Sequence, residues 1–325
     1  MPAILTHYTF ALEMLPSCSK GFDEAIFLGS QGPDPFFFYG QRPWKRRSKD
    51  YLSVNAFGSF LHHTDIAPFY ATMMKIASES GADKDLLFAY IEGLWLHYSL
   101  DRECHAYIFP ASGFSSDPVL SKRYSTLHTY FETMIDSLLS HKKGTYTSRP
   151  QKYLSLSKKQ LDSISLLWFK TNQETLKDSS IQKDTFSKSV KDYRAILRMT
   201  NTPHLLSKAF ITLIMGKNSL PAAMNIPWRI PKKLLSVDFL NECHCSWPDM
   251  ISGASHTESF FDLMNRAKKD FLMVLPFIKK ARNGEDTNLD LHSFVGVLCH
   301  DGCDPSLTKR FSKPRWPLNM IPKLK

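Results

Sequence analysis

Cysteine is scarce and long apolar runs are missing in this chain of 325 residues. Its six cysteines are too few and too unevenly spaced for the disulfide framework of a small secreted protein, so we expect reduced thiols. No apolar run approaches the roughly 18 to 20 residues that a membrane-spanning helix needs. The N-terminus lacks the basic and long apolar stretches of a signal peptide. Together these absences predict a cytoplasmic protein without a transmembrane segment.

Several catalytic motifs are missing as well. The sequence contains no Gly-x4-Gly-Lys phosphate loop, no Rossmann glycine pattern and no Gly-x-Ser-x-Gly nucleophile elbow. These absences argue against nucleotide-driven chemistry and against serine-hydrolase chemistry. Two cysteine-histidine motifs, at residues 243–245 and 299–303, lack the two-residue separation of zinc knuckles, which makes a second, structural metal site there the weaker interpretation.

Helical periodicity dominates the rest of the sequence. Apolar residues recur at three- and four-residue spacing, whereas strand-like alternation is almost absent. We therefore predict an all-α fold, a helical bundle that houses a polynuclear metal site and is followed by a further helical half. The predicted helical segments are residues 5–15, 60–78, 84–104, 121–140, 158–177, 183–199, 203–215 and 258–280.

A polar linker at residues 141–150 is the best candidate for a domain boundary. We expect a metal-site helical domain over residues 1–145 and a basic helical region over residues 146–325 that packs on it. Residues 1–150 hold 14 basic and 15 acidic residues, so the remaining 27 basic and 16 acidic residues put the whole net charge of +10 in the second half. This excess is typical of a solvated lysine-rich surface, and it would also attract a polyanion.

Histidines and acids share helix faces in the first half of the chain. His97 and Asp101 are four residues apart, which places both on one face of a helix, and His105 extends that face by another turn. The same spacing recurs in His128 and Glu132. Imidazole nitrogens and carboxylate oxygens on successive turns can converge on a divalent ion such as zinc. Facing helices of a bundle build polynuclear metal sites in this manner.

A single pair of this kind is more often a surface ion pair or a capped core histidine than part of a metal site. Asp101, however, lies in an apolar stretch, and burying its carboxylate there without a partner would cost several kcal/mol. The presence of two such pairs, with His7 and His62 in the same part of the sequence, favours metal binding.

Asp34 lies between two prolines, which stiffen the backbone and fix the direction of the carboxylate. Taken alone, the segment is explained equally well by an Asx-turn. The aromatic run at residues 36–39 is interpreted mainly as core, with a wall against an apolar part of a substrate as the alternative. His62 and His63 can likewise be solvated histidines at the start of a helix, and the sequence does not decide which of the two would bind metal.

In their order along the chain, these elements resemble the zinc-dependent phospholipases C, and more closely their cytosolic bacterial relatives. The resemblance spans residues 6–132, and five ordered elements carry it. They are Thr6-His7, Gly32-Pro33-Asp34, Gly58-x3-His62-His63, His97-x3-Asp101-x3-His105 and His128-x3-Glu132. The resemblance implies an all-α fold, a trinuclear zinc cluster and phosphodiester hydrolysis.

The resemblance also implies how eight side chains would share three zinc ions. The implied ligands are His62, His97, Asp101 and Asp34 for the first ion, His105, His128 and Glu132 for the second, and His7, an oxygen of Asp101 and the chain's amino terminus for the third. This chain begins Met1-Pro2, so a terminal ligand would be Pro2 after removal of Met1. Two departures from the secreted enzymes are the shorter spacing between Asp101 and His105 and the lack of an evident C-terminal lipid-binding β-sandwich.

The sequence therefore predicts a metal-dependent phosphoester hydrolase, a zinc phosphodiesterase of phospholipase C type with two or three zinc ions as cofactors. Asp34 is the predicted catalytic residue, which would orient or deprotonate a metal-activated water. The expected partner is a phosphoester substrate such as a phospholipid, and a nuclease or phosphomonoesterase activity stays open. The alternative from another class is a non-catalytic, zinc-stabilised helical protein whose basic half binds a polyanion.

Overall fold

The computed structural model describes residues 4–42, 49–147, 149–200, 236–285, 291, 294–296 and 298–314. Within these residues the only sheet is a two-stranded antiparallel one, so the predicted all-α class is confirmed. None of the described helices is both long and apolar enough to cross a membrane. All six cysteines are free thiols, as the sequence predicts.

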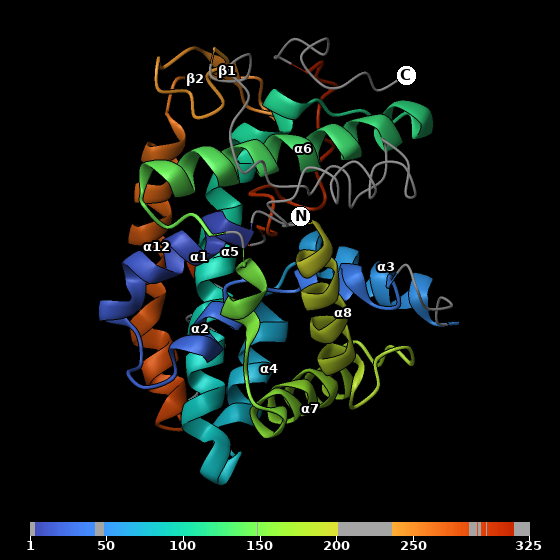
Figure 1. The fold of residues 1–325 in the computed structure, drawn as a ribbon, viewed down its shortest axis with the longest axis vertical. Helices are drawn as coiled ribbons and strands as arrows, with labels where there is room; N and C mark the ends of the chain where they lie inside the picture. The colour runs from blue at the N-terminus through green and yellow to red at the C-terminus, as the bar shows by residue number, and fades with distance from the viewer. Residues whose placement is uncertain are drawn as a thin grey trace.

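The helices surround one long central helix, as Figure 1 shows. They are α1 (Ile4–Met14), α2 (Asp23–Gly29), α3 (Tyr51–His62), α4 (Ala67–Ser78), α5 (Lys84–Ser112), α6 (Pro118–Lys142), α7 (Lys158–Glu174), α8 (Thr185–Thr200) and α12 (Phe260–Arg282). Short 3₁₀ turns are η1 (Leu15–Ser17), η2 (Asp34–Phe38), η3 (Gly81–Asp83) and η4 (Pro150–Leu154), and the strands are β1 (Trp247–Pro248) and β2 (Ser255–His256).

Two predicted helices differ from the observed ones. The predicted helix at 84–104 continues through Pro110 to Ser112, because α5 is enclosed by other elements and tertiary packing outweighs the proline. The predicted helix at 60–78 is two helices, α3 and α4. The Asp65 carboxylate accepts the Ala67 N–H at 3.0 Å and Pro68 lies in the first turn of α4, so the chain starts a new helix there. The predicted helix at 203–215 lies outside the described residues.

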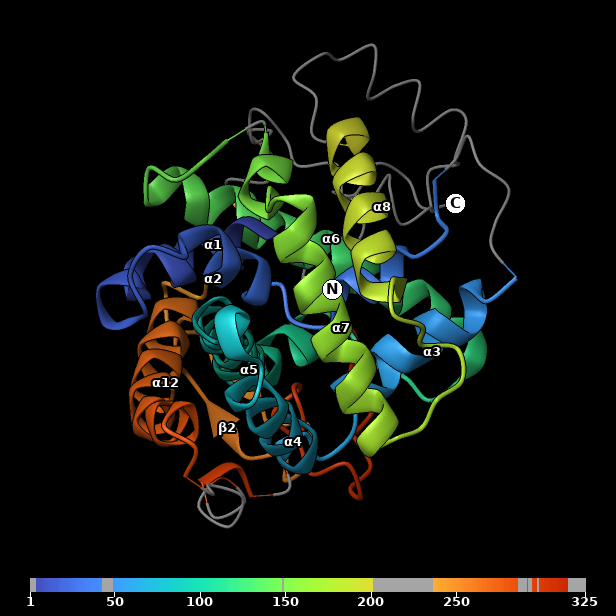
Figure 2. The same ribbon diagram turned by 90° about the horizontal axis from the view of Figure 1, so that it is seen from below.

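Helix α5 forms the core of the molecule. Nearly every side chain from Leu86 to Ser112 is buried, which is the pattern of a helix covered on all sides. Figure 2 shows α12, α4 and α2 around it, and α1, α6 and α7 also contact it. Ligand residues on any face of α5 are therefore shielded from bulk water unless a pocket reaches them.

Helix α12 comes from the basic second half and lies along α5 (Figure 1). Arg266 of α12 reaches Glu103 of α5 at 2.6 Å, and Arg102 of α5 reaches Asp270 of α12 at 3.5 Å. Ser259 begins α12 with a capping box that includes Asp262. The domain boundary near residue 145 stays a prediction.

Two glycines let α2 and α5 approach to backbone contact. A Cβ added at Gly29 would lie 2.9 Å from Gly93 Cα, and one added at Gly93 would lie 2.8 Å from Gly29 Cα. Both distances are shorter than normal carbon contacts, and the obstructing atoms are backbone rather than flexible side chain. The contact holds the α2–η2 segment, and therefore Asp34, against α5.

We predict that Gly93→Ala lowers the free energy of unfolding by about 1–3 kcal/mol, because overpacking outweighs a gain in helix propensity of about 1 kcal/mol. Urea unfolding followed by circular dichroism measures the change. Asp162→Ala, on the exposed face of α7, is the control and should change stability by about 0.5 kcal/mol or less. Equal stability of Gly93→Ala and the control would contradict the close contact.

Candidate metal centre

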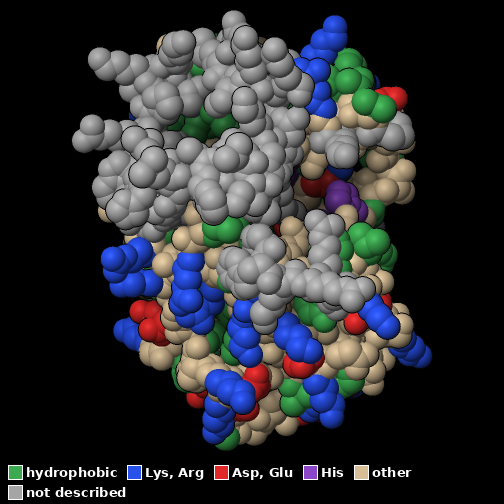
Figure 3. Space-filling view, turned by 45° about the vertical axis from the view of Figure 1, so that its right-hand side comes forward, with side chains coloured by type: hydrophobic (Ala, Val, Ile, Leu, Met, Phe, Trp, Pro, Cys, Tyr) green, Lys and Arg blue, Asp and Glu red, His purple; other side chains and the backbone are tan. Residues whose placement is uncertain are grey.

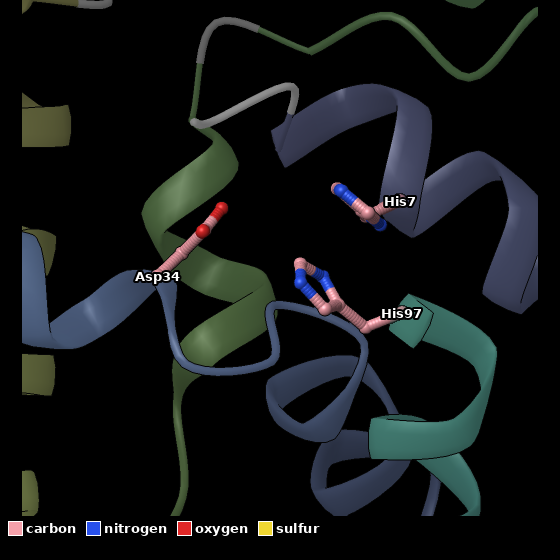
Figure 4. Close-up of side chains that lie close together, drawn as sticks. All are labelled: His7, Asp34 and His97. Carbon is pink, nitrogen blue, oxygen red and sulfur yellow. The ribbon is translucent and has the colours of Figure 1, made fainter. Parts of the chain in front are cut away.

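All eight predicted ligand residues lie around one buried centre. They come from five segments, with His7 on α1, Asp34 on η2, His62 on α3, the next three on α5 and the last two on α6. Their ligand atoms form three groups in which all distances are within 4.8 Å, namely His7, Asp34 and His97; His62, His97 and Asp101; and His105, His128 and Glu132. Figure 4 shows the first group, whose side chains point toward a common space from three separate segments.

Asp101 connects three of the histidines. One carboxylate oxygen lies 3.2 Å from His7 Nε2, and the other lies 3.1 Å from His97 Nε2. His105 Nδ1 lies 3.6 Å from the first oxygen. Burial alone would raise the pKa of Asp101, but the charges of His97, His105 and His7 hold it well below its usual range. Asp101 is therefore an ionised carboxylate in the interior.

Glu132 and Asp34 are two further buried carboxylates that face histidine nitrogens. One oxygen of Glu132 lies 3.2 Å from both His105 Nε2 and His128 Nε2, and one oxygen of Asp34 lies 3.1 Å from His62 Nε2. Burial opposes ionisation of Glu132, yet nearby positive charge and hydrogen bonds from the two histidines hold its pKa well below the usual value. Three buried carboxylates thus face imidazoles over a distance of a few ångströms.

Backbone carbonyls fix which nitrogen of three imidazoles carries the hydrogen. His62 Nδ1 donates to Gly58 O at 2.8 Å, and His97 Nδ1 donates to Ser30 O at 3.1 Å. His105 Nδ1 donates to its own helix, at Asp101 O, over 3.1 Å. A carbonyl oxygen can only accept, so Nδ1 carries a hydrogen in each ring. Nε2 faces a carboxylate oxygen in all three rings. In a protonated ring Nε2–H donates to that oxygen, whereas in a neutral ring Nε2 offers a lone pair that can bind a metal ion.

For a neutral His97 ring, a cation between Nε2 and the carboxylate would remove the repulsion between the two acceptors. His97 Nε2 is buried and has no hydrogen-bond partner among the described residues, although Asp101 Oδ2 is only 3.1 Å away. Two donors about 2.0–2.2 Å from one zinc ion are separated by about 3.1–3.2 Å when the angle between them is near 100°. The nitrogen and oxygen donors, their burial and their carbonyl-bound second nitrogens all fit a zinc centre.

Gly32 explains one element of the sequence pattern. Its φ of +54° is in the left-handed region that favours glycine, and an added Cβ would collide with the His97 ring. The glycine therefore lets the chain before Asp34 pass directly against His97. This brings Asp34 and His97 into the same ligand group.

Asp136 supports the centre without being one of its predicted ligands. It lies one helical turn beyond Glu132, and its two carboxylate oxygens accept the Leu5 and Thr6 N–H groups at 3.0 and 2.8 Å. Burial raises the pKa of Asp136 to about 7, against the lowering effect of these hydrogen bonds. The contact joins the first turn of α1 to α6 and so fixes the distance of His7 from Asp101. A buried acid one turn past a ligand pair is a signal that the sequence contains but that we did not use.

A pocket of about 400 Å³ opens onto the centre. His62, His105 and His128 line it, together with His300 and Asp301 from the C-terminal segment. Figure 3 shows histidine and acidic side chains in a hollow on the right of this face. A second cavity, of about 470 Å³ and lined by residues such as Thr72 and Glu174, has no histidine in its wall. Of these two cavities in the described part of the chain, the histidine-lined pocket of about 400 Å³ is the one that borders the candidate metal centre.

His300 is the functional-site residue that the sequence did not predict. It is 1% exposed, and its ring lies 5.1 Å from that of His62 and 5.4 Å from that of His97. Burial, reinforced by the neighbouring histidines, holds the pKa of His300 well below its usual value, so the ring is neutral. Its place could not be predicted from the sequence because about 160 residues separate it from the end of α6, and the Cys299–Cys303 motif was weighed only as a separate structural site, the weaker interpretation.

The geometry partly resolves three questions that the sequence left open: the choice between His62 and His63, the place of the aromatic run, and the role of the cysteine motifs. His62, not His63, faces Asp34, while His63 is exposed and its Nδ1 donates to Ser59 O at 2.7 Å. Phe36 and Phe38 are core, whereas Phe37 lines the pocket and packs on His62. The Cys243–Cys245 and Cys299–Cys303 motifs form no ligand group within the described part of the chain. Pro2, the predicted terminal ligand, lies outside it.

Comparison with known proteins returns no relatives. No protein-family model matches the chain, and neither the curated proteins nor the solved structures contain a match. The resemblance to zinc-dependent phospholipases C therefore stays an expectation from motif order, and the geometry of the centre has to carry the functional argument.

We predict that Asp136→Asn weakens both the fold and the metal centre. A single amide oxygen cannot accept both N–H groups in the way that two carboxylate oxygens do, so unfolding free energy should fall by about 1–2 kcal/mol. Because α1 then loses its anchor on α6, zinc should bind the His7 group more weakly. Urea unfolding and zinc titration measure the two effects.

Ser157→Ala is the matched control, since Ser157 caps α7 away from the centre. It should cost about the same stability, roughly 1 kcal/mol, and leave zinc affinity unchanged. Equal zinc affinities of the Asp136 variant and this control would show that Asp136 supports the fold alone.

Proposed function

We propose that this protein is a metal-dependent phosphoester hydrolase, most specifically a zinc phosphodiesterase. The observation that carries the proposal is the unpartnered, buried Nε2 of His97 facing the ionised Asp101, inside a ring of further imidazoles and carboxylates. The second support is the pocket that reaches three of the imidazoles. Structural zinc sites are closed by protein ligands, whereas catalytic sites keep a position open to water and substrate.

His105, His128 and Glu132 would hold one ion. His97 belongs to both other groups and has one free nitrogen, so it would serve an ion in one of them, with His62 and Asp101 or with His7 and Asp34. Ions bound there would neutralise phosphate oxygens and lower the pKa of a coordinated water from about 15.7 toward 7. The protein itself holds the imidazole donors in place through backbone carbonyls and excludes bulk water around α5. It would also supply a carboxylate to accept the proton of the coordinated water.

Asp34 is the residue that we propose for that carboxylate. It is 1% exposed and does not itself line the pocket, but one of its oxygens lies 3.1 Å from Nε2 of His62, which does. Burial raises the pKa of Asp34, but nearby positive charge and the hydrogen bond from His62 hold it below its usual value. Asp34 is therefore ionised at neutral pH and able to orient a water or accept its proton.

The substrate class of this proposal is a phosphodiester, with phospholipid as one candidate. A basic second half that binds a polyanion would suit a nuclease or a non-catalytic partner protein. Figure 3 shows basic side chains over the lower part of the face and also at its upper right, near the hollow with the histidines. Hydrolysis of an ester that enters the pocket is supported by the imidazoles that line it.

We predict that the purified protein holds about two to three zinc equivalents, because the donors form three groups and a closed zinc site uses four ligands. Elemental analysis after metal-replete expression measures the content. Zinc should also raise the melting temperature, since the ligands join five segments. Less than one equivalent, or a melting temperature that a chelator leaves unchanged, would contradict the metal centre.

We predict that Asp34→Asn lowers the rate of phosphodiester hydrolysis by about 10²–10⁴-fold while most of the zinc is retained. Asp101→Asn should do the opposite and release zinc together with stability, because its two oxygens serve several histidines. Zinc content and hydrolysis of bis(p-nitrophenyl) phosphate are measured for both variants.

The exposed Asp162→Asn serves as the control for loss of a negative charge and should match the wild type. Equal zinc loss in the Asp34 and Asp101 variants would show that Asp34 is only a ligand. A zinc-loaded wild type that hydrolyses no phosphoester on a panel of lipid, nucleotide and generic esters would support the structural alternative.

A further inference from the structure

The walls of the pocket carry information about the substrate beyond its phosphate. At about 400 Å³, the pocket is near the lower end of the roughly 300–1,000 Å³ of small-molecule sites. It has room for a phosphate beside the imidazoles of His62, His105 and His128, and for one further group of about the size of an aromatic ring. This further group would lie against the pocket walls.

Aromatic side chains form much of that wall and continue directly from the imidazoles. The Phe109 ring lies 5.0 Å from that of His128 and 5.4 Å from that of His105, and Phe114 lies 6.0 Å from Phe109. Tyr124, on α6, is a further aromatic residue that lines the same pocket. Phe109 and Phe114 are only half-buried, so part of each ring is available to a ligand.

Phe114 is held in place by the C-terminal segment. Its N–H donates to Ser312 O and its carbonyl accepts the Ser312 N–H, both at 2.9 Å. The backbone at Phe114 is therefore fixed by bonds that do not involve its side chain. A substitution that removes only the Phe114 ring should therefore leave the backbone of this pocket wall in place.

Charge is balanced in the pocket away from the metal centre. Asp301 is the only acid outside the ligand set that lines it, and Lys309 forms an ion pair with this carboxylate. The Lys309 Nζ also lies 4.9 Å from the Phe109 ring centre. No lysine or arginine of the described residues lines the pocket. Among the described lining residues, the acid that lies outside the ligand set is therefore already paired with Lys309. This pairing favours an uncharged group at the aromatic wall over a charged one.

We propose that the substrate is a phosphodiester in which an uncharged aromatic group is attached beside the phosphate, and that Phe109 and Phe114 bind this group. The inference rests on the proposed hydrolase function, because the phosphate is placed at the metal centre. Offset or edge-to-face contacts with two rings, added to the burial of apolar area, favour such a group over a small alkyl one.

Equilibrium binding to the zinc-loaded full-length protein tests the proposal without depending on turnover. Phenylphosphonate and methylphosphonate carry the same anionic group and differ only in the substituent. We expect phenylphosphonate to bind about tenfold more tightly in isothermal titration calorimetry. Phe114→Ala should reduce this ratio to near one, and Phe114→Leu should retain part of it. Phe311→Ala is the control, because Phe311 is 57% exposed and does not line the pocket.

Each result separates this inference from the function on which it rests. Equal affinities of the two phosphonates, or an unchanged ratio in Phe114→Ala, would overturn the aromatic specificity and leave the hydrolase proposal intact. A DNA hexanucleotide that bound more tightly than phenylphosphonate, with a steep salt dependence, would also overturn it in favour of a polyanionic substrate. Binding of neither phosphonate to zinc-loaded protein would overturn both proposals.

Discussion

Three ionised carboxylates buried against imidazole nitrogens are the constraint on which the structure depends. Asp101 and Glu132 have pKa values held well below the ordinary range by surrounding positive charge, and neither has bulk water to solvate it. With Nδ1 of His97 bonded to a carbonyl, Nε2 of the neutral ring offers only a lone pair. Buried charges and facing acceptors are costly, because they lose the solvation that water gave them. Metal ions at this centre would turn the carboxylates and imidazoles into shared ligands.

The remainder of the fold arranges and encloses these donors. Helix α5 carries His97, Asp101 and His105 along its length, and it is covered on all sides so that the carboxylates stay dry. The glycine contact between α2 and α5 brings η2 close, and Gly32 leaves space for the His97 ring. Asp136 connects α1 to α6. The centre is open where α3, the end of α5, α6 and the C-terminal segment meet at the pocket.

Local patterns in the sequence predicted most of the described helices and named candidate ligand residues that the fold brings close together, because the His-x3-acid spacing is a property of one helix. Their role as metal ligands stays a prediction. Asp101 and Glu132 could be identified in this way from four-residue spacing alone. What depended on tertiary contacts could not be predicted. The break between α3 and α4 coincides with the hydrogen bond from the Ala67 N–H to the Asp65 carboxylate, and α5 extends through Pro110 where other elements cover it. His300 reaches the centre only because the C-terminal segment folds back over it, which no short-range pattern encodes.

The central claim is that metal ions lie between these carboxylates and imidazoles. Anomalous X-ray diffraction from crystals of the zinc-loaded protein, recorded on both sides of the zinc absorption edge, tests it most directly. The account predicts edge-dependent peaks within about 2.0–2.2 Å of the His97 and Asp101 donors and of the His105, His128 and Glu132 donors. A map without such peaks, with protonated imidazoles bonded to the carboxylates, would contradict it.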